Sequence, residues 1–395
     1  MRRNKRSSRR LGRVVWALVP AWTLSLPATT SALTDDERQA GFVPLFNGKD
    51  LSDWVATGAT QTTFEVRDGL LYVSGRANHP AWLRSEREYE NFVLRFDFKL
   101  PHYAEGGLFL HAPLHGDNTN VGIEIEICDD VARGAKTMPC GSVFPFIHPE
   151  LRATKKYGEW NSTEVVCDWP NLRVSFNGKV VQDVDLAEHP ELRYRLRRGF
   201  LGLQDAGSRN WFRDIRIKEL PDREAWTTLF NGRDFDGWDI IGEAKWDVVE
   251  GVMRASDGNG YAVTRGKYRD FELFTYVRTS RYANGGIFFR WNSTKDRGYE
   301  IQIYNMPVGH NPTGSIYALH RADRLDARDN EWFPMHLIVQ GEHCLVRVNG
   351  HNVARGDDLG VVREGNVSLQ MHRRRSSVEF KGIRIKPSGE SILTR

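Results

Sequence analysis

The chain has 395 residues, of which 40% are hydrophobic and 27% are charged. This composition can build sizeable cores, and it excludes a disordered polymer, a collagen-like chain, a coiled coil and a polytopic membrane protein. The formal net charge is +4, but seven basic and no acidic residues lie within residues 1–32, so the remainder of the chain is slightly acidic. That remainder gives no electrostatic support for nucleic-acid binding.

Residues 1–32 have the pattern of a bacterial-type export signal. A cationic stretch precedes an apolar run over residues 14–26, and small residues follow it up to Ala32. The run is short and is interrupted by Pro20, which argues against a spanning helix. We predict a signal peptide over residues 1–32, a secreted or periplasmic protein, and no stable membrane span after signal removal. An uncleaved signal anchor or a basic tail is the alternative.

The rest of the chain contains an internal duplication. The motif Leu45–Trp54 recurs as Leu229–Trp238, and further motifs recur in the same order. Because the period far exceeds that of solenoid repeats, we predict two tandem domains, over residues 40–220 and 226–388. The other matching pairs are Gly106–Phe109 with Gly285–Phe288, Glu124–Ile127 with Glu300–Ile303, Gly141–Phe144 with Gly314–Tyr317, Asn177-Gly178 with Asn349-Gly350, and Ile215–Lys218 with Ile383–Lys386.

Each copy has the pattern of an all-β fold. Large apolar residues alternate with polar ones over residues 92–100, which is the period of a half-buried strand. Asn177-Gly178 follows another alternating run and tolerates the positive φ angles of a hairpin turn, as does Asn349-Gly350. Many short strands separated by Gly, Asn and Asp favour antiparallel sandwiches. We therefore predict two tandem β-sandwiches.

The segment Ile123–Ile127 alternates isoleucine with glutamate and predicts a strand with Glu124 and Glu126 on one face. Two neighbouring carboxylates repel each other, so one can keep its proton near neutral pH while the other is ionised. Such a pair is suited to general acid–base chemistry. A solvated strand face is the simpler alternative for this pattern.

Other polar residues are expected near this acidic pair or its counterpart. The paired glycines at 106–107 permit close approach of a ligand, and the strand after them would present His111 on its outer face. Arg290 takes the place of His111 in the second copy, where a salt bridge to Glu300 is the simpler alternative. The remaining candidate binding residues are Gln204, Asp129 and His148 in the first copy and Glu300, Gln302, His320, Gln370 and His372 in the second.

The cysteines do not form a zinc-binding pattern. Cys128 and Cys140 are near enough in sequence to close a loop if the exported chain is oxidised. Cys167 and Cys344 lie in strand-like runs and are expected in the cores, because a free cysteine behaves as a small hydrophobe.

With these motifs in this order, the chain resembles the 3-keto-disaccharide hydrolase domain family, in two tandem copies. The resemblance implies a concanavalin A/laminin-G-like jelly roll in each copy and a carbohydrate partner, namely an oxidised disaccharide or glycoside. The motifs that carry it are Leu45–Trp54, Gly106–His111, Glu124–Ile127, Glu159–Asn161, Gly202–Gln204 and Trp211–Leu220 in the first copy, and Leu229–Trp238, Gly285–Arg290, Tyr299–Ile303, Gly314–Tyr317 and Gln370 in the second.

The resemblance also implies a chemistry. A ketone at C3 of a glycoside acidifies the C2 hydrogen, so a base can remove it, C1 can lose its substituent, and water can add back. We assign Glu124 or Glu126 as base and acid, with His111 and Gln204 binding or polarising the ketone. No cofactor is otherwise indicated, although a divalent cation could replace one electrophile. The first copy is favoured as the catalytic one because it holds more carboxylates.

Two alternatives stay open at this stage. The acidic segment Glu124–Asp129 is similar to the catalytic strand of jelly-roll β-glucanases, which would imply retaining glycoside hydrolysis. A non-catalytic carbohydrate-binding module is the other alternative, because a fold does not fix a function. Tryptophans at duplicated positions are expected in the cores (Trp54, Trp160, Trp238 and Trp332), and the others are better candidates for stacking on a sugar (Trp82, Trp169 and Trp211).

Overall fold

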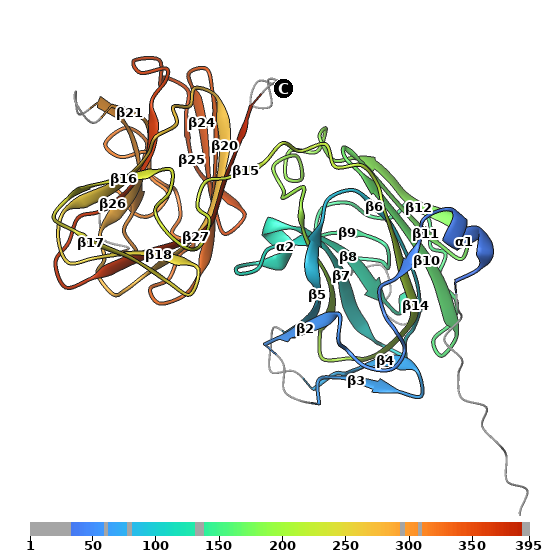
Figure 1. Cartoon of the computed structure of the whole chain (residues 1–395). Helices are drawn as coiled ribbons and strands as arrows, with labels where there is room; N and C mark the ends of the chain where they lie inside the picture. Colours follow the sequence, from blue (N-terminus) through green and yellow to red (C-terminus); the bar gives the residue numbers. More distant parts are fainter. Residues whose placement is uncertain are drawn as a thin grey trace, which may run out of the picture.

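Two β-sandwiches follow one another along the chain (Figure 1). This computed structural model describes residues 33–58, 62–76, 81–130, 138–292, 297–306 and 310–388. The predicted signal peptide, residues 1–32, lies outside the described residues. Within the described part of the chain, no helix has the length and apolar character needed to cross a bilayer.

The first copy pairs an eight-stranded sheet with a six-stranded one. The larger sheet has the order β12-β11-β10-β6-β14-β4-β3, with β1 paired to β14, and the smaller one has the order β2-β5-β13-β7-β8-β9. All pairings are antiparallel. The elements are α1 (Asp35–Gln39), β1 (Val43–Pro44), β2 (Trp54–Thr57), β3 (Phe64–Arg67), β4 (Leu70–Ser74), β5 (Ala81–Tyr89), β6 (Phe92–Lys99), β7 (Glu105–Ala112), α2 (Asn118–Val121), β8 (Ile123–Cys128), β9 (Val143–Phe144), β10 (Trp160–Asp168), β11 (Asn171–Phe176), β12 (Lys179–Asp185), β13 (Gly199–Asp205) and β14 (Arg209–Glu219).

The second copy repeats this plan with an eight-stranded and a five-stranded sheet. Their orders are β17-β18-β27-β20-β23-β24-β25, with β15 paired to β27, and β16-β19-β26-β21-β22. The strands are β15 (Thr227–Thr228), β16 (Trp238–Gly242), β17 (Lys245–Val249), β18 (Val252–Ser256), β19 (Gly260–Thr264), β20 (Phe271–Thr279), β21 (Gly285–Asn292), β22 (Arg297–Ile303), β23 (Phe333–Gln340), β24 (His343–Val348), β25 (His351–Gly356), β26 (Asn366–Met371) and β27 (Ser377–Pro387).

The predicted alternation and turns account for this architecture. In β6, Leu94, Phe96 and Phe98 are buried while the residues between them are half-buried, so one face of the strand packs into the core. Asn177 and Asn349 have φ angles of 50°, as expected for turns between β11 and β12 and between β24 and β25. The prediction of an all-β chain of two tandem jelly-roll sandwiches is confirmed.

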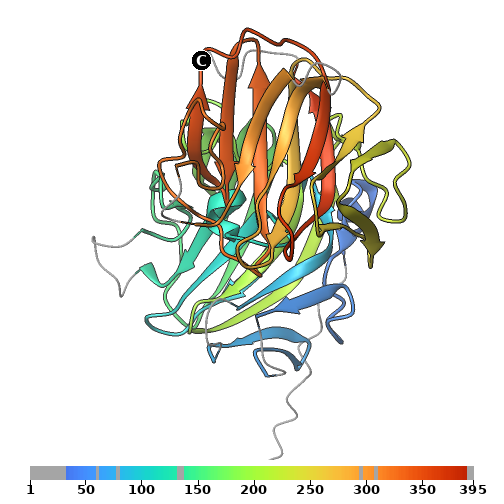
Figure 2. The same cartoon turned by 90° about the vertical axis from the view of Figure 1, so that its left-hand side faces the viewer.

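The two copies pack against each other through different faces. Figure 1 shows α2 and β5 of the first copy facing β20, β24 and β27 of the second, and Figure 2 shows the second copy in front of the first. The backbone N–H of Leu114 donates to the Tyr276 hydroxyl at 2.8 Å, and Val121 packs in one apolar cluster with Phe274 and Tyr276. Buried apolar and polar contacts therefore join the copies.

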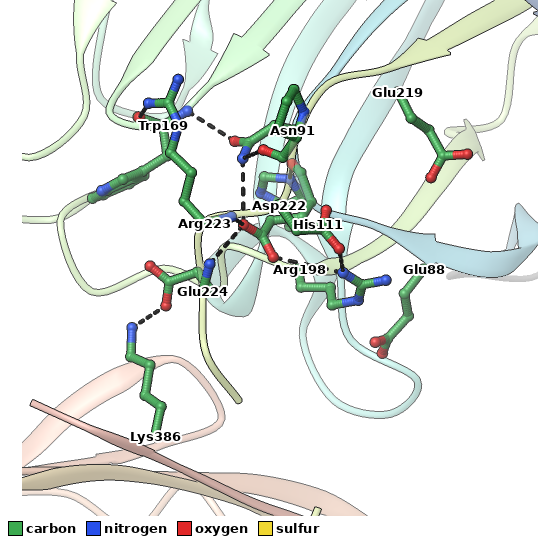
Figure 3. A network of polar contacts seen from close by, with 12 residues as sticks. Glu88, Asn91, His111, Trp169, Arg198, Glu219, Asp222, Arg223, Glu224 and Lys386 are labelled. Carbon is green, nitrogen blue, oxygen red and sulfur yellow. Dashed lines mark hydrogen bonds and ion pairs between the residues drawn. The ribbon is translucent and has the colours of Figure 1, made fainter. Parts of the chain in front are cut away.

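A network of buried charges closes the junction near the linker. Lys386 on β27 forms an ion pair with Glu224 of the linker (Figure 3). Lys386 also pairs with Glu272 on β20, at 3.0 Å. His336 lies 2.9 Å from Glu272, and Arg197 of the first copy lies 2.6 Å from Glu224. Each buried charge thus has a partner of opposite sign, which is the condition under which burial of charge is tolerated.

The cysteines are buried free thiols in this structure. Cys128 and Cys140 are not joined by a disulfide bond, in contrast to the bridge considered from the sequence. Cys167 and Cys344 are within the hydrophobic cores of the first and second copies, as predicted.

Candidate active site

The acidic strand β8 places Glu124 and Glu126 on the face of the six-stranded sheet that is turned away from the core. Ile123, Ile125 and Ile127 belong to the core cluster, so the two glutamates point to the opposite side. The predicted shared face is confirmed. Both glutamates are nevertheless buried, which differs from the alternative of a solvated strand face.

Glu124 lies in a pocket of polar neighbours. Its side chain is only 4% exposed, and Thr119 Oγ1, on α2, donates a hydrogen bond of 2.5 Å to its Oε2. The side chain of Gln204 on β13 also hydrogen-bonds to it. Burial raises the pKa of Glu124 to about 7, and the hydrogen bonds from Thr119 and Gln204 oppose this shift only in part. At neutral pH this carboxyl can therefore both give and take a proton.

Two glycines make room for this arrangement. A Cβ on Gly107 would lie 2.5 Å from Glu124 Oε1 and 3.2 Å from Gln204 Oε1. A Cβ on Gly202 would lie 2.4 Å from the ring of Trp82. The paired glycines were expected to expose backbone to a ligand, whereas Gly107 in fact accommodates the carboxyl group.

Gly107→Ala is accordingly expected to displace the Glu124 and Gln204 side chains. Any enzymatic turnover that depends on the Glu124 carboxyl should fall strongly, while the protein remains folded. The matched control is Gly286→Ala, because a Cβ at Gly286 would meet Glu300 Oε1 of the second copy at 2.6 Å. Turnover and thermal unfolding of both variants check this. Equal turnover of the two variants would show that turnover does not depend on the position of the Glu124 carboxyl.

A pocket of about 580 Å³ lies over this face, between the two copies. This volume is within the range of about 300–1,000 Å³ that is typical of small-molecule sites. Thr119 and Gln204, which hydrogen-bond to Glu124, line the pocket, although Glu124 itself does not. The Trp82 and Phe109 rings form an edge-to-face pair there at 5.9 Å. The pocket is lined by Ala81, Trp82, Phe109, Gly116, Asp117, Asn118, Thr119 and Gln204 of the first copy and by Leu325, Asp326, Arg328, Glu331, Trp332, Phe333 and Asn349 of the second.

The expected orientation of His111 is wrong. His111 has a φ of 53°, and its ring is buried against Phe92 rather than facing Glu124. Its Nε2 lies 2.7 Å from the Glu90 carbonyl oxygen and donates to it. Burial lowers the pKa of His111 to about 4, so the ring is neutral at pH 7. The left-handed backbone at this position turns the side chain from the outer face into the interior.

Arg290 makes the same turn in the second copy. Its φ is 50°, its side chain is buried, and its guanidinium donates to the Arg269 carbonyl and to Asp270 Oδ1 at 2.9 Å. Neither the predicted binding role on the outer face nor the alternative salt bridge to Glu300 matches this position. His111 and Arg290 thus occupy equivalent bends in β7 and β21, and both have a structural role.

Several other predicted binding residues lie apart from the pocket. Asp129 accepts hydrogen bonds from the Tyr103 N–H and from His102 Nδ1, both at 3.0 Å. His148 and His372 are exposed, and His320 pairs with Asp358 at 2.8 Å. None of these four candidates (Asp129, His148, His320 and His372) is among the described residues that line the pocket.

The second copy brings Glu300, Gln302 and Gln370 together on the equivalent face, as predicted. Burial raises the pKa of Glu300 to about 7, and Gln370 Nε2 donates to the Tyr261 hydroxyl at 3.2 Å. Figure 1 shows β16, β21 and β26 of this sheet on the side of the second copy that faces away from the first. The connection between β7 and β8 (residues 113–122), which carries α2 and Thr119, is longer than the connection between β21 and β22.

The prediction of core tryptophans is confirmed for Trp54 and Trp238, which are buried and donate from their indole N–H groups to backbone carbonyls. Of the stacking candidates, Trp82 lines the pocket, whereas Trp169 and Trp211 are not among the described residues that line it. Trp332 is half-buried in the pocket wall instead of in a core. Its counterpart Trp160 is also half-buried, beneath Arg213 at 4.1 Å.

The residues that sequence reasoning missed are Thr119 and the wall from the second copy. The extra length between the aligned Gly-Gly and Glu-Ile-Glu motifs was a signal for Thr119, since an insertion next to a site often contributes to it. No pattern could have found Arg328 or Asn349, because their place in the pocket depends on how the copies pack. In the described part of the chain, no three His, Cys, Asp or Glu side chains are grouped so as to hold a metal ion.

Comparison with known proteins agrees with a chain of two tandem copies. The chain belongs to the 3-keto-α-glucoside-1,2-lyase-like domain family, whose model matches residues 41–218 and 225–386. It is 31% identical over 85 residues to a 3-keto-disaccharide hydrolase of Bacteroides thetaiotaomicron, a match that spans 18% of this chain and 29% of that relative.

Solved structures with similar folds each correspond to about half of the chain. A crystal structure from Parabacteroides distasonis ATCC 8503, named as a candidate glycosyl hydrolase, is 22% identical with a TM-score of 0.43, over 48% of this chain and 99% of that one. A carbohydrate-binding module of Bacillus subtilis, CBM66, is 15% identical with a TM-score of 0.31, over 42% of this chain and 99% of that one.

Proposed function

We propose that the first copy cleaves 3-keto-glycosides by elimination across C1 and C2 followed by addition of water. The observation that carries the proposal is Glu124, a buried carboxyl whose pKa is raised to about 7 and whose hydrogen-bond partners line the pocket between the copies. Membership of the family supports the substrate class. The predicted signal peptide supports action outside the cytoplasm.

The steps balance without an added oxidant or reductant. A base takes the C2 proton, and the C–H electron pair forms the enolate with the C3 ketone. When the ketone re-forms, a C1–C2 double bond is made, the C1–O bond breaks, and the leaving oxygen takes a proton. Water then adds to C1 and a proton returns to C2, which gives the free 3-keto sugar and the released alcohol.

The pocket residues supply the groups that these steps need. Glu124 exchanges the proton, since a carboxyl with a pKa near the working pH is effective both as base and as acid. Gln204 binds the ketone side of the ring, and the Trp82 and Phe109 rings pack against its apolar face. Glu126, which β8 places on the same face as Glu124, is the second carboxyl that we assign to proton transfer.

The test is incubation of the chain without residues 1–32 with 3-keto-trehalose and with trehalose, each with and without a chelator. We expect cleavage of the oxidised sugar alone. Cleavage of an unoxidised glucan without cleavage of the 3-keto sugar would support the retaining-glucanase alternative. Sugar binding with no turnover of any sugar would support a binding module.

Thr119→Val is expected to move the pH dependence of kcat to higher pH. The Thr119 hydroxyl lowers the pKa of Glu124 by hydrogen bonding to its ionised form, so its removal raises that pKa above about 7. Because the ionised carboxyl is the base, activity rises with pH through this pKa, and the midpoint of the rise follows it upward. Thr163→Val, at a buried threonine of β10, is the control. An unchanged midpoint in Thr119→Val would contradict the role of Glu124 as base.

A further inference from the structure

We infer that the second copy forms the leaving-group half of the first copy's substrate site. This inference rests on the proposed function and deepens it: the wall contributed by residues 325–333 and Asn349 would bind the second sugar ring of a 3-keto-disaccharide. The pocket has two chemically different sides. Thr119 and Gln204, the hydrogen-bond partners of Glu124, line the first copy's side, and residues of the second copy line the opposite side.

The wall offers groups that recognise sugar hydroxyls. Arg328 makes a long ion pair of 3.9 Å with Glu331, and its side chain is 81% exposed, so its planar guanidinium keeps donors for a ligand. Glu331 and Asp326 add acceptors, and Asp326 is itself held at 2.5 Å by Arg324. Donors and acceptors next to one another suit a polyhydroxylated leaving group better than a small alkyl one.

The wall also offers a fixed aromatic ring. Trp332 stacks on His115 of the first copy, with ring centroids 5.8 Å apart and an angle of 22° between planes. Lys381 Nζ lies 4.3 Å and the Arg278 guanidinium 4.7 Å from the Trp332 ring centroid. Contacts from both copies therefore hold the indole in place, which makes it a rigid part of the wall.

A hydrogen bond joins the wall to the segment that carries Thr119, the partner of Glu124. The Asp117 N–H donates to Asn349 Oδ1 at 2.9 Å, and Asp117 caps α2 by accepting from the Thr119 N–H at 2.9 Å. Gly116 allows this approach, because a Cβ there would lie 2.4 Å from Asn349 Oδ1. Asn349 thus connects the wall to the α2 segment that carries Thr119.

Arg328→Ala in the full chain tests the wall, because an exposed side chain can be removed without unfolding the protein. We compare 3-keto-trehalose, whose leaving group is a sugar, with methyl 3-keto-α-glucoside, whose leaving group is small. The loss of a charged donor is expected to raise KM for 3-keto-trehalose about tenfold or more, with kcat and the methyl glycoside little changed. Arg355→Ala, at an exposed arginine of β25 away from this pocket, is the control.

Equal effects of Arg328→Ala on both substrates, or no effect on either, would overturn the inference while leaving the proposed function intact. Absence of turnover by the unmodified chain would instead overturn the proposed function. The wall is then tested by titration calorimetry in a Glu124→Gln background, where Arg328→Ala should weaken binding of 3-keto-trehalose about tenfold and leave the methyl glycoside unchanged. Unchanged binding of both ligands would reject the wall as a binding site.

Discussion

Replacing Glu124 by Gln is expected to lower kcat for cleavage of 3-keto-trehalose by about 10²–10⁴-fold, the usual contribution of general acid–base catalysis. Glutamine preserves the size of the side chain and keeps one oxygen that can accept a hydrogen bond, but it cannot exchange a proton. KM should change little, because glutamine keeps the shape of the side chain and the residues that line the pocket are unchanged. Steady-state kinetics, with product analysis to exclude slow background hydrolysis, measure the effect.

Glu300→Gln is the matched control for this prediction. Glu300 is the counterpart of Glu124, also has a pKa raised to about 7 by burial, and lies on the second copy's own face. Its substitution should leave kcat for the first copy's reaction within twofold or so of the unmodified value. A loss in Glu300→Gln as large as that in Glu124→Gln would move the catalytic role, wholly or in part, to the second copy.

The largest effect on stability is expected from Glu272→Ala. Glu272 is 4% exposed and pairs with Lys386 at 3.0 Å and with His336 at 2.9 Å, so its removal leaves the buried ammonium with less compensation. Breaking a buried pair in this way costs about 3–5 kcal/mol. Calorimetric unfolding of the full chain should show the transition of the second copy at a clearly lower temperature.

The control and the pH dependence separate this pair from a surface contact. Glu342→Ala removes an exposed pair with Arg363 at 2.6 Å and should cost less than about 1 kcal/mol. Although burial opposes it, hydrogen bonding to His336 and the charge of Lys386 lower the pKa of Glu272 from its ordinary value of 4.5. Its stabilisation is therefore fully present above about pH 4.5 and is lost as the pH falls below that value. Equal destabilisation by the two substitutions would contradict the role given to Glu272.

The architecture could be predicted from the sequence because its signals are local. The alternation in β6 and the turns at Asn177 and Asn349 depend on side-chain period and backbone preference, which a single sequence displays. The shared face of Glu124 and Glu126 follows from the same period.

The candidate site could be predicted only in part, because burial and packing between distant segments decide it. His111 and Arg290 continue an outward-facing pattern, but their positive φ angles turn them inward, and residues of these types seldom adopt such angles. Thr119 becomes a partner of Glu124 only through α2, and Trp332 enters the pocket only because the two copies pack against each other. No sequence period encodes these contacts.

The most direct test of C2 deprotonation uses methyl 3-keto-α-glucoside labelled with deuterium at C2, under conditions where the released sugar does not itself exchange. We expect slower cleavage than with the unlabelled sugar and loss of the label to solvent, with both abolished in Glu124→Gln. Cleavage at the unlabelled rate, with the deuterium retained at C2 of the released sugar, would show direct displacement at C1 and contradict the account.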